Sequence, residues 1–217
     1  MNPNKPFPIE TELIPDEFRV AIFGSARIKP GEPIYQRVFD LAREVGKRDI
    51  DIVTGGGPGV MEAANYGHKV GSSDESQSIG LTIELPFESE GNKHLDIKRH
   101  FHKFSERLDT FMKLSNVLVV MPGGIGTALE LFYAWQLIQV QHVPKMPIIL
   151  HGEEWHHLTD WVHKDMLDGG YIDQKDLDCV YCVKHNHEAL EIIFDAYDRY
   201  KKTGKETFKK YGKYGLR

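Results

Sequence analysis

Short runs of apolar and β-branched residues alternate with helical patterns through most of this 217-residue chain. The runs are apolar at consecutive positions rather than at every second one, which is typical of strands buried on both faces of a sheet. Runs of this kind separated by helices predict a parallel sheet. The strands expected from the pattern cover residues 19–23, 50–54, 78–83, 116–121, 146–150 and 178–183.

Apolar residues recur at helical spacing between these strands. The first such segment ends at Gly46 and carries Tyr35, Val38, Leu41, Ala42 and Val45. We therefore expect an α/β fold, a Rossmann-like doubly wound parallel sheet with helices on both faces, built by a single domain. The other expected helices cover about 60–70, 98–113, 127–141, 155–167 and 187–201.

The two ends of the chain differ in composition from its middle. Residues 1–18 hold four of the 11 prolines and no helical periodicity, so we expect an extended leader. Residues 202–217 are basic, and we expect a loosely held, solvated tail. Residues 19–201 form the expected domain, which is long enough to bury a core without disulfides or a structural metal.

Charge and composition argue against several classes of partner. The net charge of -5 at pH 7 disfavours broad binding to a nucleic-acid backbone, so we expect no nucleic-acid partner. The apolar runs are far too short to cross a bilayer, and the acidic, proline-rich start does not have the pattern of a signal peptide. Only 2 cysteines are present, which fits a reducing compartment. We therefore expect a cytoplasmic protein with no membrane partner.

The sequence predicts neither a metal site nor a cofactor. Cys179 and Cys182 form a C-x-x-C, and His185 and His187 follow closely. Residues three apart in a strand point to opposite faces, however, and there is no second pair to complete a zinc site. We expect an ordinary strand at this place. The other histidines do not show the H-E-x-x-H spacing or a comparable one.

Three glycine-rich loops follow expected strands and would meet at one edge of the sheet. They cover residues 24–26, 54–59 and 122–127. In an open parallel sheet, ligands bind outside the carboxyl ends of the strands, where loops meet helix N-termini. One glycine-rich loop usually just makes a turn, whereas three at the same edge indicate a ligand site.

The third loop has the composition of a phosphate site. Its glycines allow backbone N–H groups to approach an oxyanion, and the helix that follows adds its positive dipole end. No lysine follows the last glycine, as a P-loop requires, and Leu129 stands where the dinucleotide fingerprint has its third glycine. The sequence therefore supports neither an ATPase nor an NAD-dependent enzyme.

Two interpretations of Thr127 and Glu130 are open. The pair forms T-x-x-E, so its side chains could close the start of a helix as a capping box. Alternatively, Glu130 could accept the sugar hydroxyls of a nucleotide, because a carboxylate beside a phosphate site is costly unless the chemistry uses it. Basic residues of the expected helix upstream would point to the same edge, and Arg107, about two helical turns before the strand, is the best placed. These residues are Arg99, His100, His102, Lys103 and Arg107.

The sequence GGGPGVMEAAN at 55–65 and the sequence PGGIGTALE at 122–130, with Arg107 between them, carry a family resemblance. They resemble the LONELY GUY (LOG) family of cytokinin riboside 5'-monophosphate phosphoribohydrolases and bacterial relatives, whose hallmark is PGGxGTxxE. The resemblance covers about residues 18–200. It implies hydrolysis of the N-glycosidic bond of a nucleoside 5'-monophosphate, AMP or a cytokinin riboside monophosphate, to free base and ribose 5-phosphate. Some members are labelled lysine decarboxylases, but no lysine here is placed as a Schiff-base anchor for pyridoxal phosphate.

The resemblance also implies roles for individual residues. Glu130 would hold the ribose hydroxyls and stabilise positive charge on the sugar, and Arg107 would orient the substrate or assist the leaving base. The family's helix reads Arg-Lys, whereas Leu108 follows Arg107 here. Glu88, in the loop at 85–92, would lie near the base or the dimer partner. The implied substrate-binding residues are Ser25, Gly56, Gly57, Glu88, Gly123, Gly124, Gly126 and Thr127.

The oligomeric state and the rival functions also follow from the resemblance. Family members are typically dimers that pack through the helix after the PGGxGTxxE motif, so a homodimer is implied. The helix expected at 127–141 is apolar over more of its surface than one sheet contact needs, which agrees with that. The rival class is a binding module, because molybdenum-cofactor carrier proteins share the fold and glycine loops and hold a phosphorylated ligand without cleaving it. A nucleotide sensor is a further alternative.

Overall fold

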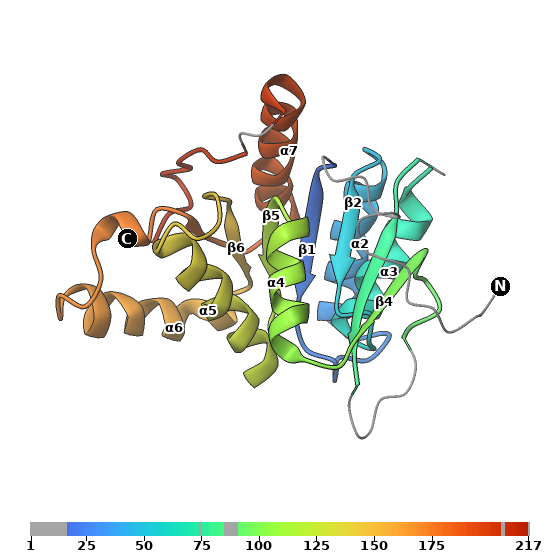
Figure 1. Cartoon of the computed structure of the whole chain (residues 1–217), viewed down its shortest axis with the longest axis horizontal. Helices are drawn as coiled ribbons and strands as arrows, with labels where there is room; N and C mark the ends of the chain where they lie inside the picture. Colours follow the sequence, from blue (N-terminus) through green and yellow to red (C-terminus); the bar gives the residue numbers. More distant parts are fainter. Residues whose placement is uncertain (1–16, 74, 85–90, 205–206, 217) are drawn as a thin grey trace.

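A seven-stranded parallel sheet forms the centre of the protein (Figure 1). The computed structural model describes residues 17–73, 75–84, 91–204 and 207–216. The strand order is β4-β3-β2-β1-β5-β6-β7, and all neighbouring pairs are parallel. This confirms the expected Rossmann-like α/β fold. The strands are β1 (Arg19–Phe23), β2 (Asp51–Thr54), β3 (Ser78–Ile83), β4 (Ile97–Phe101), β5 (Val117–Val120), β6 (Ile148–His151) and β7 (Val180–Val183).

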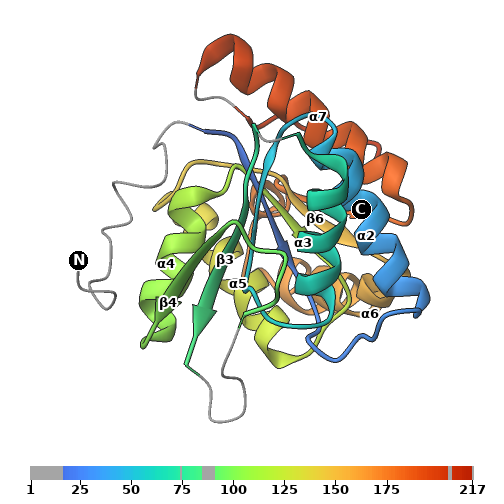
Figure 2. The ribbon, with the colours of Figure 1, turned by 90° about the vertical axis from the view of Figure 1, so that its right-hand side faces the viewer.

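Helices cover both faces of the sheet (Figure 2). One face carries α2 (Pro33–Gly46), α3 (Val60–Gly71) and α7 (Asn186–Thr203). The other carries α4 (Phe104–Leu114), α5 (Ile125–Gln139) and α6 (His156–Trp161), and α6 continues as a π-helical segment over Val162–Leu167. Two single 3-10 turns, Glu153–Trp155 and Gln174–Asp176, lie in the connections. None of the described helices combines the length and hydrophobicity that a bilayer span requires.

The central strands are buried at every position, as their unalternated apolar sequences predict. In β1, Val20 and Ile22 belong to the core under α2, α3 and α7. Ala21 and Phe23 belong to the core on the opposite face. Successive side chains of a strand point to opposite faces, so each central strand contributes to both cores. Parallel backbone pairing places β1 between β2 and β5, and helices cover both of its faces.

The edge strand β4 corrects the sequence interpretation. We expected a helix over 98–113, but Ile97–Phe101 forms a strand parallel to β3, and α4 begins only at Phe104. The strand lies at the sheet's edge, and its residues alternate between buried and exposed. That period of two is the signal of a half-buried strand, and the charged residues hid it within what looked like one helical stretch.

Helices α2 and α3 approach so closely that two positions of α3 require glycine. A Cβ on Gly67 would lie 2.1 Å from the carbonyl oxygen of Phe39, and a Cβ on Gly71 would lie 2.1 Å from that of Arg43. Both contacts are with backbone, which cannot rotate away. These glycines therefore set the distance between the two helices, and with it the position of the loop that precedes α3.

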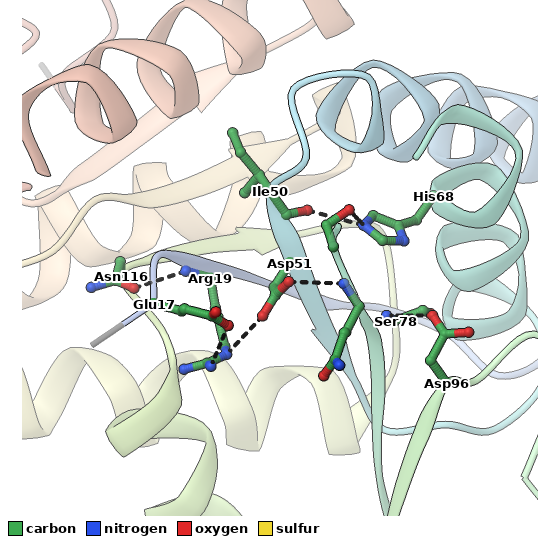
Figure 3. Close-up of polar contacts among 10 residues, drawn as sticks. Glu17, Arg19, Ile50, Asp51, His68, Ser78, Asp96 and Asn116 are labelled. Atoms are coloured by element: carbon green, nitrogen blue, oxygen red, sulfur yellow. Dashed lines mark hydrogen bonds and ion pairs between the residues drawn. The ribbon is translucent and has the colours of Figure 1, made fainter. Parts of the chain in front are cut away.

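A buried charge cluster lies at the amino ends of β1 and β2, where Arg19 and Asp51 are the first residues of their strands (Figure 3). The glycine loops follow the carboxyl ends of the same strands. Arg19, which is only 1% exposed, donates from Nε to Asp51 at 3.1 Å and from Nη2 to Glu17 at 3.0 Å. The backbone N–H of Arg19 donates to the side chain of Asn116 at 2.8 Å. A buried guanidinium is tolerated only when carboxylates compensate its charge. This cluster therefore ties β1 to β2 at one end while the loops meet at the other.

The C-terminal segment packs against the sheet, so the expectation of a solvated tail is wrong for the described residues 207–216. Tyr211 and Tyr214 are buried, and the ring of Tyr211 packs edge-on against Tyr181 of β7. The backbone N–H of Cys182 donates to the carbonyl of Tyr214 at 2.9 Å. The leader is described only from residue 17, and Phe18 packs against Tyr197 of α7.

The two cysteines behave as the strand interpretation predicts. Cys179 precedes β7 and is buried, Cys182 lies within the strand, and both are free thiols. Burial raises the pKa of Cys179 to about 12 and that of Cys182 to about 11. Neither thiol is prepared to act as a nucleophile or to ligate a metal as thiolate.

Replacing Gly67 by alanine tests the close approach of α2 and α3. We expect Gly67→Ala to lower the free energy of unfolding by about 2 kcal/mol, because the new methyl group meets the backbone of α2. The measurement is urea denaturation followed by circular dichroism. Gly212→Ala is the matched control, since a Cβ there meets nothing within 4 Å. Equal stability of Gly67→Ala and wild type would contradict this packing.

Candidate active site

The three glycine-rich loops meet at the carboxyl ends of β1, β2 and β5. The order of the sheet reverses at β1, because the chain builds outward from it first through β2 and later through β5. Such a switch point leaves a crevice between adjacent loops, and ligands of open α/β sheets bind there. The fold therefore places the candidate site where the glycine loops predicted it.

The backbone of Ser25 joins the three loops directly. Its N–H donates to the carbonyl of Pro122 in the third loop at 3.1 Å. Its own carbonyl accepts from the N–H of Val60, at the end of the second loop, at 3.0 Å. Gly59 has φ +70, and a Cβ there would lie 2.4 Å from the Ser25 carbonyl oxygen. Glycine is thus needed at position 59 both for the backbone conformation and for this junction.

Hydrogen bonds from polar side chains that do not line the cavity hold the second loop in place. The Thr54 hydroxyl accepts from the N–H of Gly56 at 3.0 Å and donates to buried Asn65 of α3 at 2.9 Å. The side-chain amide of Asn92 donates to the carbonyls of Gly56 and Gly57 at 3.2 and 3.0 Å. The same amide also donates to Asn65 at 2.9 Å. The asparagine of the GGGPGVMEAAN segment therefore positions the loop and has no direct contact with the cavity.

These loops surround a cavity of about 860 Å³, large enough for a nucleotide. It contains the candidate residues of all three loops together with the two charged candidates. Those that line it are Ser25, Gly56, Gly57, Arg107, Gly123, Gly124, Gly126, Thr127 and Glu130. Glu88 lies outside the described residues. The structure thus brings together every described residue to which the resemblance gives a role, whereas the further basic candidates Arg99, His102 and Lys103 do not line the cavity.

The start of α5 forms one wall of this cavity. Its cap residue Gly124 makes no side-chain cap hydrogen bond, and the first turn carries no acidic residue. A Cβ at Gly124 or at Gly126 would meet nothing within 4 Å, so packing does not require glycine at either position. Because neither position carries a side chain, the backbone N–H groups at the start of the helix stay accessible to a ligand. The arrangement fits an anion held by backbone donors and the helix dipole.

Arg107 and Glu130 form an ion pair at the cavity wall. Nη2 of Arg107, on α4, donates to Oε1 of Glu130, on α5, at 2.7 Å. The two side chains are 12% and 11% exposed. The Arg107 guanidinium lies near the rings of Phe104 and Phe111, 5.8 and 5.6 Å from their centroids. Its Nε is buried and has no hydrogen-bond partner among the described residues, so one donor at the site remains to be satisfied.

Burial and the ion pair act on Glu130 in opposite directions. Burial raises the pKa of Glu130 to about 6, and the charge and hydrogen bond of Arg107 counteract part of that rise. A carboxyl group with this pKa is still mostly ionised at neutral pH. Only Oε1 is engaged among the described residues, so the second oxygen is available to accept hydrogen bonds. Glu130 therefore presents a fixed, partly desolvated carboxylate to the cavity, with Arg107 as its counter-ion.

The capping-box interpretation of Thr127 and Glu130 is wrong. Helix α5 begins at Ile125 with Gly124 as its cap, so Thr127 already lies within the first turn. Glu130 is one turn further along and contacts Arg107, not the helix start. The position of the cap, which the T-x-x-E pattern alone does not reveal, rules out the capping box. The role of Glu130 towards a sugar stays a prediction.

The sequence interpretation missed several residues that line the cavity, some of them on β3 and β4. Among those missed are Arg27, directly after the first loop, Thr82 of β3 and Lys98 of β4. His100 also lines the cavity, but it lies on β4 and not on a helix as we expected. Leu108, which replaces the family's lysine, is buried and does not line the cavity.

The fold and the site define an α/β protein with a glycine-lined cavity at the switch point of a parallel sheet. Residues 52–193 match a family model described as "Possible lysine decarboxylase". The chain belongs to this family, which is the LOG family.

Curated relatives are similar to this chain over part of their length. The chain is 30% identical over 140 residues to the pyrimidine/purine nucleotide 5'-monophosphate nucleosidase of Escherichia coli strain K12. It is equally similar to the protein of the same name from Escherichia coli O157:H7. The match covers 61% of this chain and 30% of the relative, so the chain spans about a third of the relatives' length.

Solved structures share the fold over most of the chain. A Northeast Structural Genomics Consortium target superposes with a TM-score of 0.62 at 25% identity, covering 82% of this chain and 98% of that one. The molybdenum cofactor binding protein of Rippkaea orientalis superposes with a TM-score of 0.62 at 19% identity, covering 82% of this chain and 96% of that one. At 19% identity, the similarity to the molybdenum cofactor binding protein concerns the fold alone.

The titration of Glu130 tests the electrostatics of the site. We expect its carboxyl carbon to titrate near pH 6 in carbon-13 NMR of the unliganded protein, with Glu130→Gln identifying the signal. Arg107→Met should raise this midpoint further, because it removes the charge and the hydrogen bond that favour the ionised form. Lys103→Met, at an exposed cation just before α4, should leave it unchanged. A wild-type midpoint at the ordinary glutamate value of 4.5 would refute the proposed environment.

Proposed function

We propose that this protein hydrolyses the N-glycosidic bond of a nucleoside 5'-monophosphate and so acts as a phosphoribohydrolase. The observation that carries the proposal is the Arg107–Glu130 pair at 2.7 Å, on the wall of the glycine-lined cavity. The helix start at Gly124 would take the 5'-phosphate. The names of the curated relatives support nucleotide cleavage as the class of reaction.

In this proposal the positions of phosphate and sugar follow from the helix geometry. With the phosphate at the first turn of α5, Glu130 lies about one turn further on and meets the ribose. Its free oxygen would accept the sugar hydroxyls, and its charge would stabilise the oxocarbenium-like transition state. Arg107 would keep the carboxylate ionised and fixed in place.

The proposed chemistry needs only water as co-substrate. The C1'–N bond breaks and its electron pair leaves with the base. The water oxygen bonds to C1' of the ribose, and the proton that water gives up reaches the departing base. The products are the free base and ribose 5-phosphate. We propose AMP or a cytokinin riboside monophosphate as the preferred substrate.

We further propose that the protein is a homodimer that associates through α5. Ile125 is 89% exposed and Leu129 47% exposed, both on this helix beside the cavity. Leaving large apolar side chains in water at this place is unfavourable, and a second copy of the same helix would bury them. A dimer built in this way would also bring each cavity close to the partner subunit.

Removing the carboxylate tests the proposed reaction. We expect wild type to release free base, measured by chromatography, from at least one monophosphate in a panel of AMP, GMP, CMP, UMP and isopentenyladenosine monophosphate. Glu130→Gln should lower that rate by about 10²-fold or more, because the charge that stabilises the transition state is lost. Glu106→Gln is the matched control, an exposed carboxylate on α4.

The same panel separates the proposal from its rival. The corresponding nucleosides should not be cleaved, because the helix start needs the phosphate. If the protein binds monophosphates but releases no base from any of them, it is a carrier or sensor and the proposed reaction is refuted. Turnover by Glu130→Gln at the wild-type rate would remove the catalytic role of Glu130.

A charge on α5 tests the proposed dimer. We expect light scattering after size-exclusion chromatography to give twice the 24.8 kDa chain mass for wild type and a single chain mass for Leu129→Glu. Burying an unpaired carboxylate in an apolar interface is strongly unfavourable. Val70→Glu, at an exposed apolar residue of α3, should remain dimeric. A monomeric wild type would contradict this arrangement.

A further inference from the structure

Two histidines and a glutamate gather at the edge of the sheet, beside the cavity but outside the proposed catalytic pair. Glu84 directly follows β3, His100 lies in β4, and His102 directly follows β4. One possible ligand atom from each side chain lies within 4.8 Å of the other two. All three side chains are exposed, so small rotations bring them together at little cost.

The register of the two strands places the three side chains on one face. Thr82 pairs with His100 in the parallel ladder, and the N–H of Glu84 continues that ladder by donating to the carbonyl of Phe101 at 3.1 Å. Side chains two residues apart in extended backbone point the same way. His100 and His102 therefore share a face, and Glu84 reaches the same face from the neighbouring chain segment.

Hydrogen bonds already orient His100 as a metal ligand. The Thr82 hydroxyl has one proton, which it donates to the carbonyl of Arg99 at 3.0 Å. In its contact with Nδ1 of His100, at 3.2 Å, the hydroxyl is therefore the acceptor and Nδ1 carries the proton. The lone pair of the neutral ring is then on Nε2. Protein metal sites commonly fix the tautomer and orientation of a histidine ligand through such a bond on the other nitrogen.

Side-chain atoms of Glu84 and His102 already lie nearly as far apart as two ligand atoms bound to the same metal ion. Nδ1 of His102 lies 2.9 Å from Oε2 of Glu84. In a tetrahedral zinc site, with bonds of about 2.0–2.1 Å, ligand atoms lie roughly 3.3 Å apart. An ion could therefore enter this pair with small side-chain rotations, and His100 would complete a set of three ligands.

We propose that Glu84, His100 and His102 bind a divalent transition-metal ion of the zinc class. Two imidazoles and one carboxylate suit Zn²⁺ and its neighbours in the first transition series, whereas Mg²⁺ and Ca²⁺ take oxygen ligands. Three protein ligands leave a fourth coordination position for water or a bound molecule. Because His100 also lines the cavity, the ion lies at the cavity rim. This site does not depend on the proposed reaction.

Titration of the metal-free full-length chain with Zn²⁺ tests the site. We expect calorimetry to detect a site in wild type whose affinity falls by about tenfold or more in His102→Ala and in Glu84→Gln, since each removes one of three ligands. His142→Ala is the matched control, because His142 is an exposed histidine outside the cluster, and its affinity should equal that of wild type. No Zn²⁺ binding by wild type, or wild-type affinity in both ligand variants, overturns the proposal.

Co²⁺ provides a readout of coordination that is independent of affinity. Four-coordinate Co²⁺ absorbs visible light strongly, so wild type and His142→Ala should develop this absorption and the ligand variants should lose it. Circular dichroism of each variant checks that it is folded. If one ligand variant fails to fold, the other ligand variant provides the test of the metal site. Visible absorption of wild-type strength in a folded His102→Ala or Glu84→Gln variant places the ion elsewhere and refutes the site.

Discussion

The cavity depends on the main chain of Ser25, which holds three separate loops in one arrangement. Its N–H and carbonyl bond to Pro122 and Val60, and only a glycine at position 59 leaves room for the second contact. Ser25 lies two residues after β1, a central strand that is buried on both faces, so the junction is anchored in the core of the sheet. The loops therefore cannot move independently of the core, and a binding site built from them is held in place before any ligand arrives.

The Arg107–Glu130 ion pair lies on the wall of the cavity that these loops form. Removing a carboxylate from water is costly, and an ion pair in a protein interior offsets that cost only when the geometry is good. Here the two helices that carry the pair pack on the same face of the sheet, which fixes the 2.7 Å contact. The protein thus keeps a charge where bulk water would not screen it. In the proposed reaction, preorganised charge of this kind would stabilise the transition state, and electrostatic stabilisation is usually the largest single contribution to enzyme catalysis.

Much of the fold and of the cavity could be predicted from the sequence, because buried parallel strands and glycine loops leave local signals. The first strand was predicted at its observed bounds, and nine candidate residues line one cavity. The edge strand β4 was missed, because half-buried strands carry charged residues that also fit a helix. The histidine cluster was missed with it, since His100 and His102 become neighbours on one face only if the backbone is extended. The capping-box interpretation was wrong because the T-x-x-E pattern does not show at which residue α5 begins.

The docked C-terminal segment has a consequence for the behaviour of the protein in concentrated solution. An open parallel sheet ends in two strands whose outer N–H and C=O groups are templates for aggregation. At β7 the segment occupies part of that template, with a bridge between Tyr181 and Gly215 and the Cys182 N–H bonded to Tyr214. At β4 the exposed positions carry Lys98 and His100, whose polarity discourages strand addition. Truncating the last ten residues would therefore expose the backbone N–H and C=O groups at this edge of β7 to pairing with another chain.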